Sequence, residues 1–217
     1  DASKDETDDM PIKFVLDELT IDVSALTGSG GVTASFAAGG ILSADADGGT
    51  RILAGIEGVE RIHLIGGAGG DELSGGPASD LQSPGFAGIG YALSGLAGND
   101  RLTGANGPTA FYGGAGRDTM IGGDASDSFV ITLHAEGRPF VEHDVIVGGE
   151  QDTPNVFGGD VVIFTDGRAG AAIIDLAAAM SDPDHPEISG VEALAIQGSS
   201  AAEGDSLAGS AAREWIT

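Results

Sequence analysis

The chain has 217 residues, and its 9 Lys and Arg against 34 Asp and Glu give a formal net charge of −25 at pH 7. This charge excludes nucleic acid, which needs a basic surface, and disfavours an anionic membrane surface. Glycine contributes 38 residues and aromatic residues only 5%, which excludes a thick core of large side chains. We therefore expect a repetitive stack or bound metal to stabilise the fold.

Hydrophobic residues nevertheless reach 41%, which indicates a chain able to fold once its charge repulsion is relieved. The absence of cysteine rules out disulfides and thiolate metal sites. The longest apolar stretch, Ala169–Met180, is short and contains Asp175, so we expect no membrane insertion. Cations are the natural partners of such a chain.

The N-terminal region divides into a tail and a β segment. Residues 1–10 are predicted to be an acidic flexible tail, because Asp1–Asp9 contains four Asp and one Glu. Residues 11–65 are expected to form an N-terminal β flank. Its β-branched or alternating runs, Leu19–Val23 and Val32–Phe36, predict strands.

The middle of the chain repeats with a period of nine residues. Four consecutive units keep one register: Gly95–Thr103, Gly104–Tyr112, Gly113–Ile121 and Gly122–Val130. Gly66–Ser74 fits the same frame and Gly75–Asp80 begins a degenerate successor, after which a loop insert at 81–93 interrupts the series. A repeat of this kind predicts a stack of identical structural units.

Each unit combines a turn with a short strand. Its first six residues are rich in glycine and end in Asp, as a tight turn requires. In the last three residues the middle side chain is expected to point inward and to form the core; these side chains are Leu73, Leu102, Phe111, Met120 and Phe129. Two units make one coil of 18 residues, so Asp100 stacks on Asp118 at one edge, and Thr109 replaces Asp opposite Asp127 at the other.

Stacked carboxylates repel each other, which makes this arrangement costly without a cation. Two carboxylates about 4 Å apart repel by roughly 4 kcal/mol at an effective dielectric near 20. Ca²⁺ reverses the sign of this energy, because it binds 6–8 oxygen atoms from carboxylates and carbonyls. Folding and calcium binding are therefore expected to occur together.

These units resemble the repeats of the RTX family of secreted bacterial proteins, whose pattern is G-G-x-G-x-D-x-U-x. The resemblance implies that residues 66–130 form an all-β, right-handed parallel β-roll. It also implies several bound Ca²⁺ ions, export by a type I secretion system, and folding on calcium outside the cell or at its surface.

The resemblance also implies which residues bind calcium. Motif positions two and four would contribute carbonyl oxygens, and position six a carboxylate. Carried over, the ligands are Gly67, Gly69, Asp71, Leu96, Gly98, Asp100, Gly114, Gly116, Asp118, Gly123, Ala125 and Asp127. Asp80 and Asp205 are weaker candidates in degenerate turns.

Residues 131–217 are expected to form a C-terminal β flank. Strands are predicted at Val145–Val147, Val161–Phe164 and Ala172–Asp175. Ile188–Ile196 resembles Ile56–Ile65 and leads to a degenerate repeat at Gly204–Gly209. Trp215 is interpreted as a cap, because the open end of a β stack must be covered against edge pairing.

No catalytic arrangement is evident from the sequence, and we expect a protein that is not an enzyme. The four histidines, His63, His134, His143 and His185, show no metal-binding spacing. No serine occupies a G-x-S-x-G elbow. Beyond calcium, the candidate partners are a cell-surface glycan or protein, or a second copy of the chain.

Three functions are consistent with these features. The first is a structural, adhesive or surface-layer segment made rigid by calcium. The second is a C-terminal accessory module of a secreted enzyme such as a metalloprotease, lipase or polysaccharide epimerase. The third is calcium-dependent self-processing at Asp182-Pro183.

Overall fold

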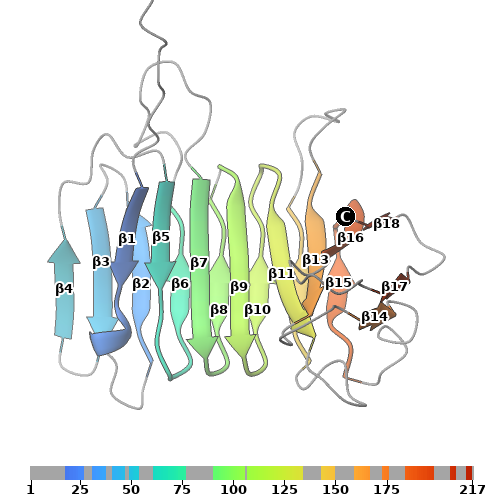
Figure 1. Ribbon diagram of the computed structural model, residues 1–217. Helices are drawn as coiled ribbons and strands as arrows, with labels where there is room; N and C mark the ends of the chain where they lie inside the picture. Colours follow the sequence, from blue (N-terminus) through green and yellow to red (C-terminus); the bar gives the residue numbers. More distant parts are fainter. Residues whose placement is uncertain are drawn as a thin grey trace, which may run out of the picture.

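The structure is a computed structural model, and it describes part of the chain. The described residues are 18–26, 31–37, 41–46, 49–53, 61–76, 90–105, 107–133, 143–149, 159–166, 173–175, 184–197, 206–208 and 214–216. They form an all-β protein built from two large sheets (Figure 1). The only helical segment described is a single 3-10 turn, Ser24–Leu26.

Within the described residues each large sheet has eight strands. The first, sheet A, has the order β1 (Glu18–Asp22), β5 (Arg61–Ile65), β7 (Gly90–Ala97), β9 (Thr109–Ala115), β11 (Ser128–Leu133), β13 (Val161–Asp166), β16 (Ala193–Gln197) and β18 (Glu214–Ile216). The second, sheet B, has the order β15 (Glu187–Ser189), β12 (Val145–Val147), β10 (Thr119–Ile121), β8 (Arg101–Thr103), β6 (Glu72–Ser74), β2 (Thr33–Ala37), β3 (Ile41–Ala46) and β4 (Gly49–Leu53). A separate pair joins β14 (Ile173–Asp175) to β17 (Ser206–Ala208).

The chain alternates between the two sheets. From β5 to β13 every odd-numbered strand lies in sheet A and every even-numbered strand in sheet B, and all of these strands pair in parallel. Each strand therefore stacks on the strand two elements earlier, and the two sheets lie face to face (Figure 1). Only the β2–β3–β4 end of sheet B is antiparallel.

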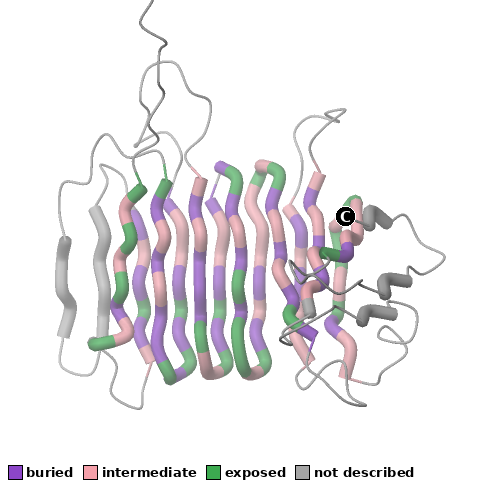
Figure 2. Tube along the Cα trace, viewed as in Figure 1, coloured by how far each residue is buried: buried purple, intermediate pink, exposed green. Residues whose placement is uncertain are grey.

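The core consists of stacked columns of identical inward positions. In sheet B, Leu73, Leu102 and Met120 stand in register and are fully buried. In sheet A, the rings of Phe111 and Phe129 stack with centroids 4.8 Å apart and planes 6° from parallel. Each such side chain contributes about 1.5–3 kcal/mol by burial, and Figure 2 shows buried positions alternating along the central strands. The predicted inward column is confirmed.

The predicted strands are largely where the structure has them, with one correction. The loop insert was predicted at 81–93, but β7 begins at Gly90, so its last four residues are strand. Tyr91 and Leu93 are buried and stand opposite Ile62 and Leu64 of β5, so packing on the preceding sheet A strand extends this strand beyond the repeat unit. The tail 1–10 lies outside the described residues.

The flanks continue the two sheets. β1 pairs with β5 and β2 with β6, while β12 and β13 pair with β10 and β11. Trp215 lies in β18, the final strand in the order of sheet A, and its role as a cap stays a prediction. No helix of the described part is long and apolar enough to cross a membrane.

The close approach of neighbouring turns makes a specific prediction at Gly116. A Cβ atom there would lie 1.6 Å from the Gly98 carbonyl oxygen, and the Gly116 φ of 128° disfavours any side chain. Gly116→Ala should lower the free energy of unfolding by about 1–3 kcal/mol, measured by chemical denaturation in calcium. The matched control is Gly90→Ala, where the nearest atom is 3.8 Å away and little change is expected. Equal effects at both positions would contradict the stacking of these turns.

Candidate metal-binding turns

The turns between the sheets form two edges. Turns 66–71, 95–100 and 113–118 lead from sheet A to sheet B and lie at what we call the first edge. Turns 104–109 and 122–127 lead back to sheet A at the second edge. Alternate turns of the described residues therefore lie at opposite edges of the two sheets.

A ladder of carboxylates runs along the first edge. The Asp71 N–H donates to Asp100 Oδ1 at 2.7 Å, and the Asp100 N–H donates to Asp118 Oδ1 at 2.9 Å. The Asp118 N–H in turn donates to Asp144 Oδ1 at 2.9 Å, and the Val32 N–H to Asp71 Oδ1 at 2.7 Å. The stacking of Asp100 on Asp118 is confirmed, and Asp71 joins the same edge despite lying 29 residues before Asp100.

A second ladder runs along the other edge. The Thr109 N–H donates to Asp127 Oδ1 and the Asp127 N–H to Asp160 Oδ1, both at 2.8 Å. The Asp160 N–H donates to Glu192 Oε2 at 2.6 Å. Thr109 thus stands in an Asp position of this ladder, as predicted.

The nine-residue repeat does not predict the outer members of the two ladders, which are Asp144, Asp160 and Glu192. Inserted residues separate them from the preceding units, so they fall outside the nine-residue register. The available signal was an acidic residue directly before a short apolar strand, as in Asp144-Val-Ile-Val147, Asp160-Val-Val-Ile163 and Glu192-Ala-Leu-Ala195.

Glycine is required at the first motif position because the carboxylate of position six folds back over it. A Cβ atom at Gly95 would lie 2.1 Å from Asp100 Oδ2, and one at Gly113 would lie 2.3 Å from Asp118 Oδ2. The same clash occurs between Gly66 and Asp71 at 2.2 Å. The spacing Gly-x₄-Asp therefore encodes the turn itself, whatever it binds.

The second carboxylate oxygen has different surroundings in different turns. The Gly67 N–H donates to Asp71 Oδ2, and the Gly123 N–H donates to Asp127 Oδ2 at 2.7 Å. In turn 95–100 the equivalent residue is Leu96, whose φ is 75°. Asp100 is only 2% exposed, and its Oδ2 has no hydrogen-bond partner. A buried neutral polar group without a hydrogen-bond partner destabilises a fold by roughly 1–3 kcal/mol, and an ionised oxygen destabilises it by more.

Carbonyl oxygens of the first edge point toward neighbouring turns. A Cβ atom at Gly98 would lie 2.3 Å from the Gly69 oxygen, and one at Gly114 would lie 2.2 Å from the Leu96 oxygen. The Gly98 oxygen faces Gly116 in the same way. Oxygen atoms of motif positions two and four therefore lie between successive turns, beside the carboxylate ladder.

The remaining predicted ligands divide into three groups. The Gly67 carbonyl already accepts the Ala97 N–H at 3.1 Å, and the Gly123 carbonyl faces Gly149. Gly116 and Ala125 lie in the expected turns. Asp80 and Asp205 lie outside the described residues.

Carboxylates alone do not make a metal cluster here. Among the residues that the structure describes, no group of three or more His, Cys, Asp or Glu could hold a metal ion. Each turn carries one motif carboxylate, so a cation between turns would depend on carbonyl oxygens for most of its ligands. Such ligation suits Ca²⁺, which accepts backbone carbonyls, and does not suit a transition metal.

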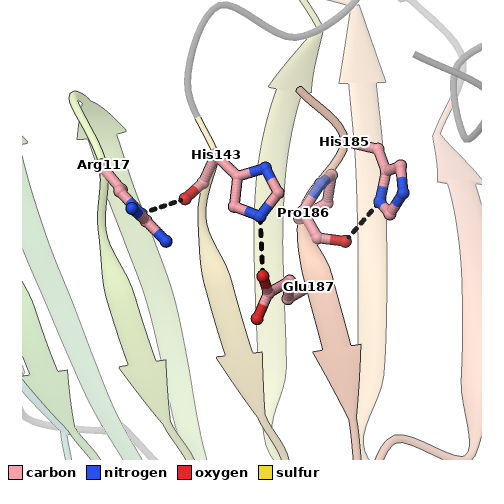
Figure 3. Close-up of polar contacts among 5 residues, drawn as sticks. All are labelled: Arg117, His143, His185, Pro186 and Glu187. Atoms are coloured by element: carbon pink, nitrogen blue, oxygen red, sulfur yellow. Dashed lines mark hydrogen bonds and ion pairs between the residues drawn. The ribbon is translucent and has the colours of Figure 1, made fainter. Parts of the chain in front are cut away.

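Two of the histidines come together in a way the sequence did not indicate (Figure 3). His143 Nε2 lies 2.9 Å from Glu187 Oε1, and the His143 and His185 rings are 6.2 Å apart. The Arg117 Nε–H donates to the His143 carbonyl at 3.1 Å. The hydrogen bond from His143 lowers the pKa of Glu187. This exposed cluster ties β10, β12 and β15 together across sheet B; His134 lies outside the described residues.

The chain was compared with protein-family models, curated proteins and solved structures, and none of them matches. The class that the fold itself defines is an all-β protein with two parallel sheets. The RTX resemblance rests on the residues alone.

Burial in the ladders changes the acidity of two carboxyl groups. Desolvation raises the pKa of Asp100 from 3.8 to about 6. The hydrogen bond from the Asp71 N–H lowers this pKa in part, and repulsion by the Asp71 carboxylate raises it further. Desolvation likewise raises the pKa of Asp127 to about 6, against hydrogen bonds from Gly123 and Thr109. Both groups therefore take up a proton at a higher pH than an ordinary Asp carboxyl does.

These shifts predict how the calcium-free fold depends on pH. A carboxyl pKa raised from 3.8 to about 6 adds stability that is complete below pH 3.8 and is lost as pH rises through about 6. In chelator, the folded fraction of the chain should therefore increase from about pH 7.5 to about pH 5, measured by far-UV circular dichroism. The double variant Asp100→Asn/Asp127→Asn should flatten this dependence. A stability that falls over this interval would contradict the assignment.

Proposed function

We propose that the protein is a calcium-binding parallel β-roll that folds around Ca²⁺ ions held between its stacked turns. The alternation of successive strands between two parallel sheets supports the β-roll. The main observation in support of calcium binding is Asp100 Oδ2, a buried carboxylate oxygen without a hydrogen-bond partner. It lies in the first-edge ladder, where the Leu96 and Gly98 carbonyl oxygens face the next turn.

Charge and oxygen supply together favour a hard divalent cation. The chain carries −25 and each ladder brings its carboxylates into direct succession, so the calcium-free fold is strained by like charges. Residues of motif positions two, four and six, such as Leu96, Gly98 and Asp100, would hold the ion. Bound calcium would supply the positive charge that lets both ladders stay ionised and stacked.

In this reading the protein serves as a structural or adhesive segment outside the cell or at its surface, made rigid by extracellular calcium. The same stack would serve an accessory module of a secreted enzyme. The mass of the native secreted polypeptide separates these roles, because an enzyme parent must be much longer than 217 residues. Self-processing at Asp182-Pro183 stays a prediction, since this bond lies outside the described residues.

Calcium should convert a largely unfolded chain into a β-rich one. We expect far-UV circular dichroism to show a cooperative gain of β structure at about 10⁻⁴–10⁻³ M Ca²⁺, the range of extracellular calcium modules. Mg²⁺ should not replace it, because Mg²⁺ demands octahedral geometry and keeps its waters. A chain that stays unfolded in saturating calcium, or that folds equally with Mg²⁺, would refute the coupling.

The Asp100 carboxylate should be important for this affinity. Asp100→Asn retains an oxygen for the Asp71 N–H but removes the charge, and we expect apparent calcium affinity to fall by roughly tenfold or more. Asp124→Asn is the matched control, because Asp124 is an exposed residue at motif position three of turn 122–127. Calorimetric titration of both variants gives the comparison. Equal losses would indicate a general charge effect and not a site at Asp100.

A further inference from the structure

The outer face of sheet A contains a hollow that shares only Thr109 with the carboxylate ladders. Its volume is about 450 Å³, within the roughly 300–1,000 Å³ of small-molecule sites. It lies at the starts of β5, β7, β9 and β11, beside the turns of the second edge. Residues of these strands that line it, such as His63 and Tyr112, alternate with the inward-facing core positions.

The floor of the hollow is formed by small residues. Ala92 and Ala110 stand opposite each other on neighbouring strands, and Gly90 begins the same strand as Ala92. In the same row across the sheet lie His63 on one side and Ser128 on the other. His63 and Ser128 thus flank a strip of small residues on β7 and β9.

The walls offer both donors and acceptors of hydrogen bonds. Arg61 and Glu18 are register partners at the starts of β5 and β1, so opposite charges lie side by side. His63 Nε2 and Ser94 Oγ are 2.9 Å apart. The hydroxyl groups of Ser126 and Ser128 also line the hollow.

An aromatic ring borders this polar space. Tyr112 lines the hollow and is 42% exposed, although most large hydrophobic residues in the described part of the chain are buried. Leu96, 49% exposed, lies two residues beyond Ser94, the register partner of Tyr112 on the adjacent strand. An exposed tyrosine combines an apolar face with a polar tip, and it can stack on a ring-shaped ligand.

We propose that this hollow binds a neutral oligosaccharide. A neutral sugar has C–H faces for Tyr112 and the alanine floor, and hydroxyl edges that both donate and accept hydrogen bonds. An acidic polymer is disfavoured because the protein carries −25 and Glu18 lies within the hollow. A bound sugar would be the ligand of the adhesive role proposed above, and this inference rests on that role. The hollow itself requires only that sheet A is folded.

The test is calorimetric titration of the full chain, in calcium, with cellotetraose, xylotetraose, mannotetraose and chitotetraose, and with tetragalacturonate as the charged arm. We expect one of the neutral tetrasaccharides to bind. Its affinity should fall about tenfold or more in Tyr112→Ala, which removes the ring, and in Ala110→Leu, which fills the floor. Arg101→Gln, on the exposed side of sheet B, is the matched control and should change affinity by less than about twofold.

Circular dichroism of each variant shows that the sheet is folded, and Tyr112→Ala alone suffices if Ala110→Leu does not fold. Binding of no neutral tetrasaccharide, binding insensitive to Tyr112→Ala, or binding of tetragalacturonate alone would overturn the proposal. A chain that is already folded without calcium, or that folds equally with Mg²⁺, would refute the calcium coupling and leave this result intact, since sugar binding is read on folded protein. The two proposals therefore fail independently.

Discussion

The structure depends on the hydrogen bond from the backbone N–H of one turn to the carboxylate of the next. This bond recurs from Asp71 to Asp100, from Asp100 to Asp118 and from Asp118 to Asp144. It fixes the distance and register between coils, and so it places the inward side chains of sheet B directly above one another. A bond to an ionised acceptor contributes about 1.5–3 kcal/mol.

The same ladder brings like charges together, and the two energies are of similar size. Successive strands lie about 4.8 Å apart, so ionised neighbours on one edge repel by roughly 3–4 kcal/mol at an effective dielectric near 20. Repulsion therefore equals or exceeds the hydrogen bonding at neutral pH. Desolvation is the main cause of the raised pKa values of Asp100 and Asp127, and repulsion by Asp71 and Asp160 adds to it, so a proton relieves what a cation would otherwise relieve.

Much of this could be predicted from the sequence, because a nine-residue period fixes both strand and turn. Leu102 and Met120 were recognised as core, and Asp100 and Asp118 as stacked, from spacing alone. Asp144 and Asp160 were not, because insertions in the turns change spacing without changing the stack. The hollow was also beyond prediction, since it arises only where neighbouring strands bring Ala92 beside Ala110.

The two ends of the sheet A strands are specialised differently, and Leu96 explains how. At the first edge the pairing of β7 with β9 continues to Leu96–Gly114 and Ala97–Ala115, with positive φ at Leu96 and Gly114. The Leu96 N–H consequently does not reach Asp100 as the Gly67 N–H reaches Asp71. Extending the sheet into the turn thus leaves a buried carboxylate oxygen there, while at the opposite end Thr109 takes the place of an Asp. The stronger demand for a cation therefore lies at the first edge, whereas the hollow begins beside the less charged second edge and extends along the strands to Ser94 and Tyr112.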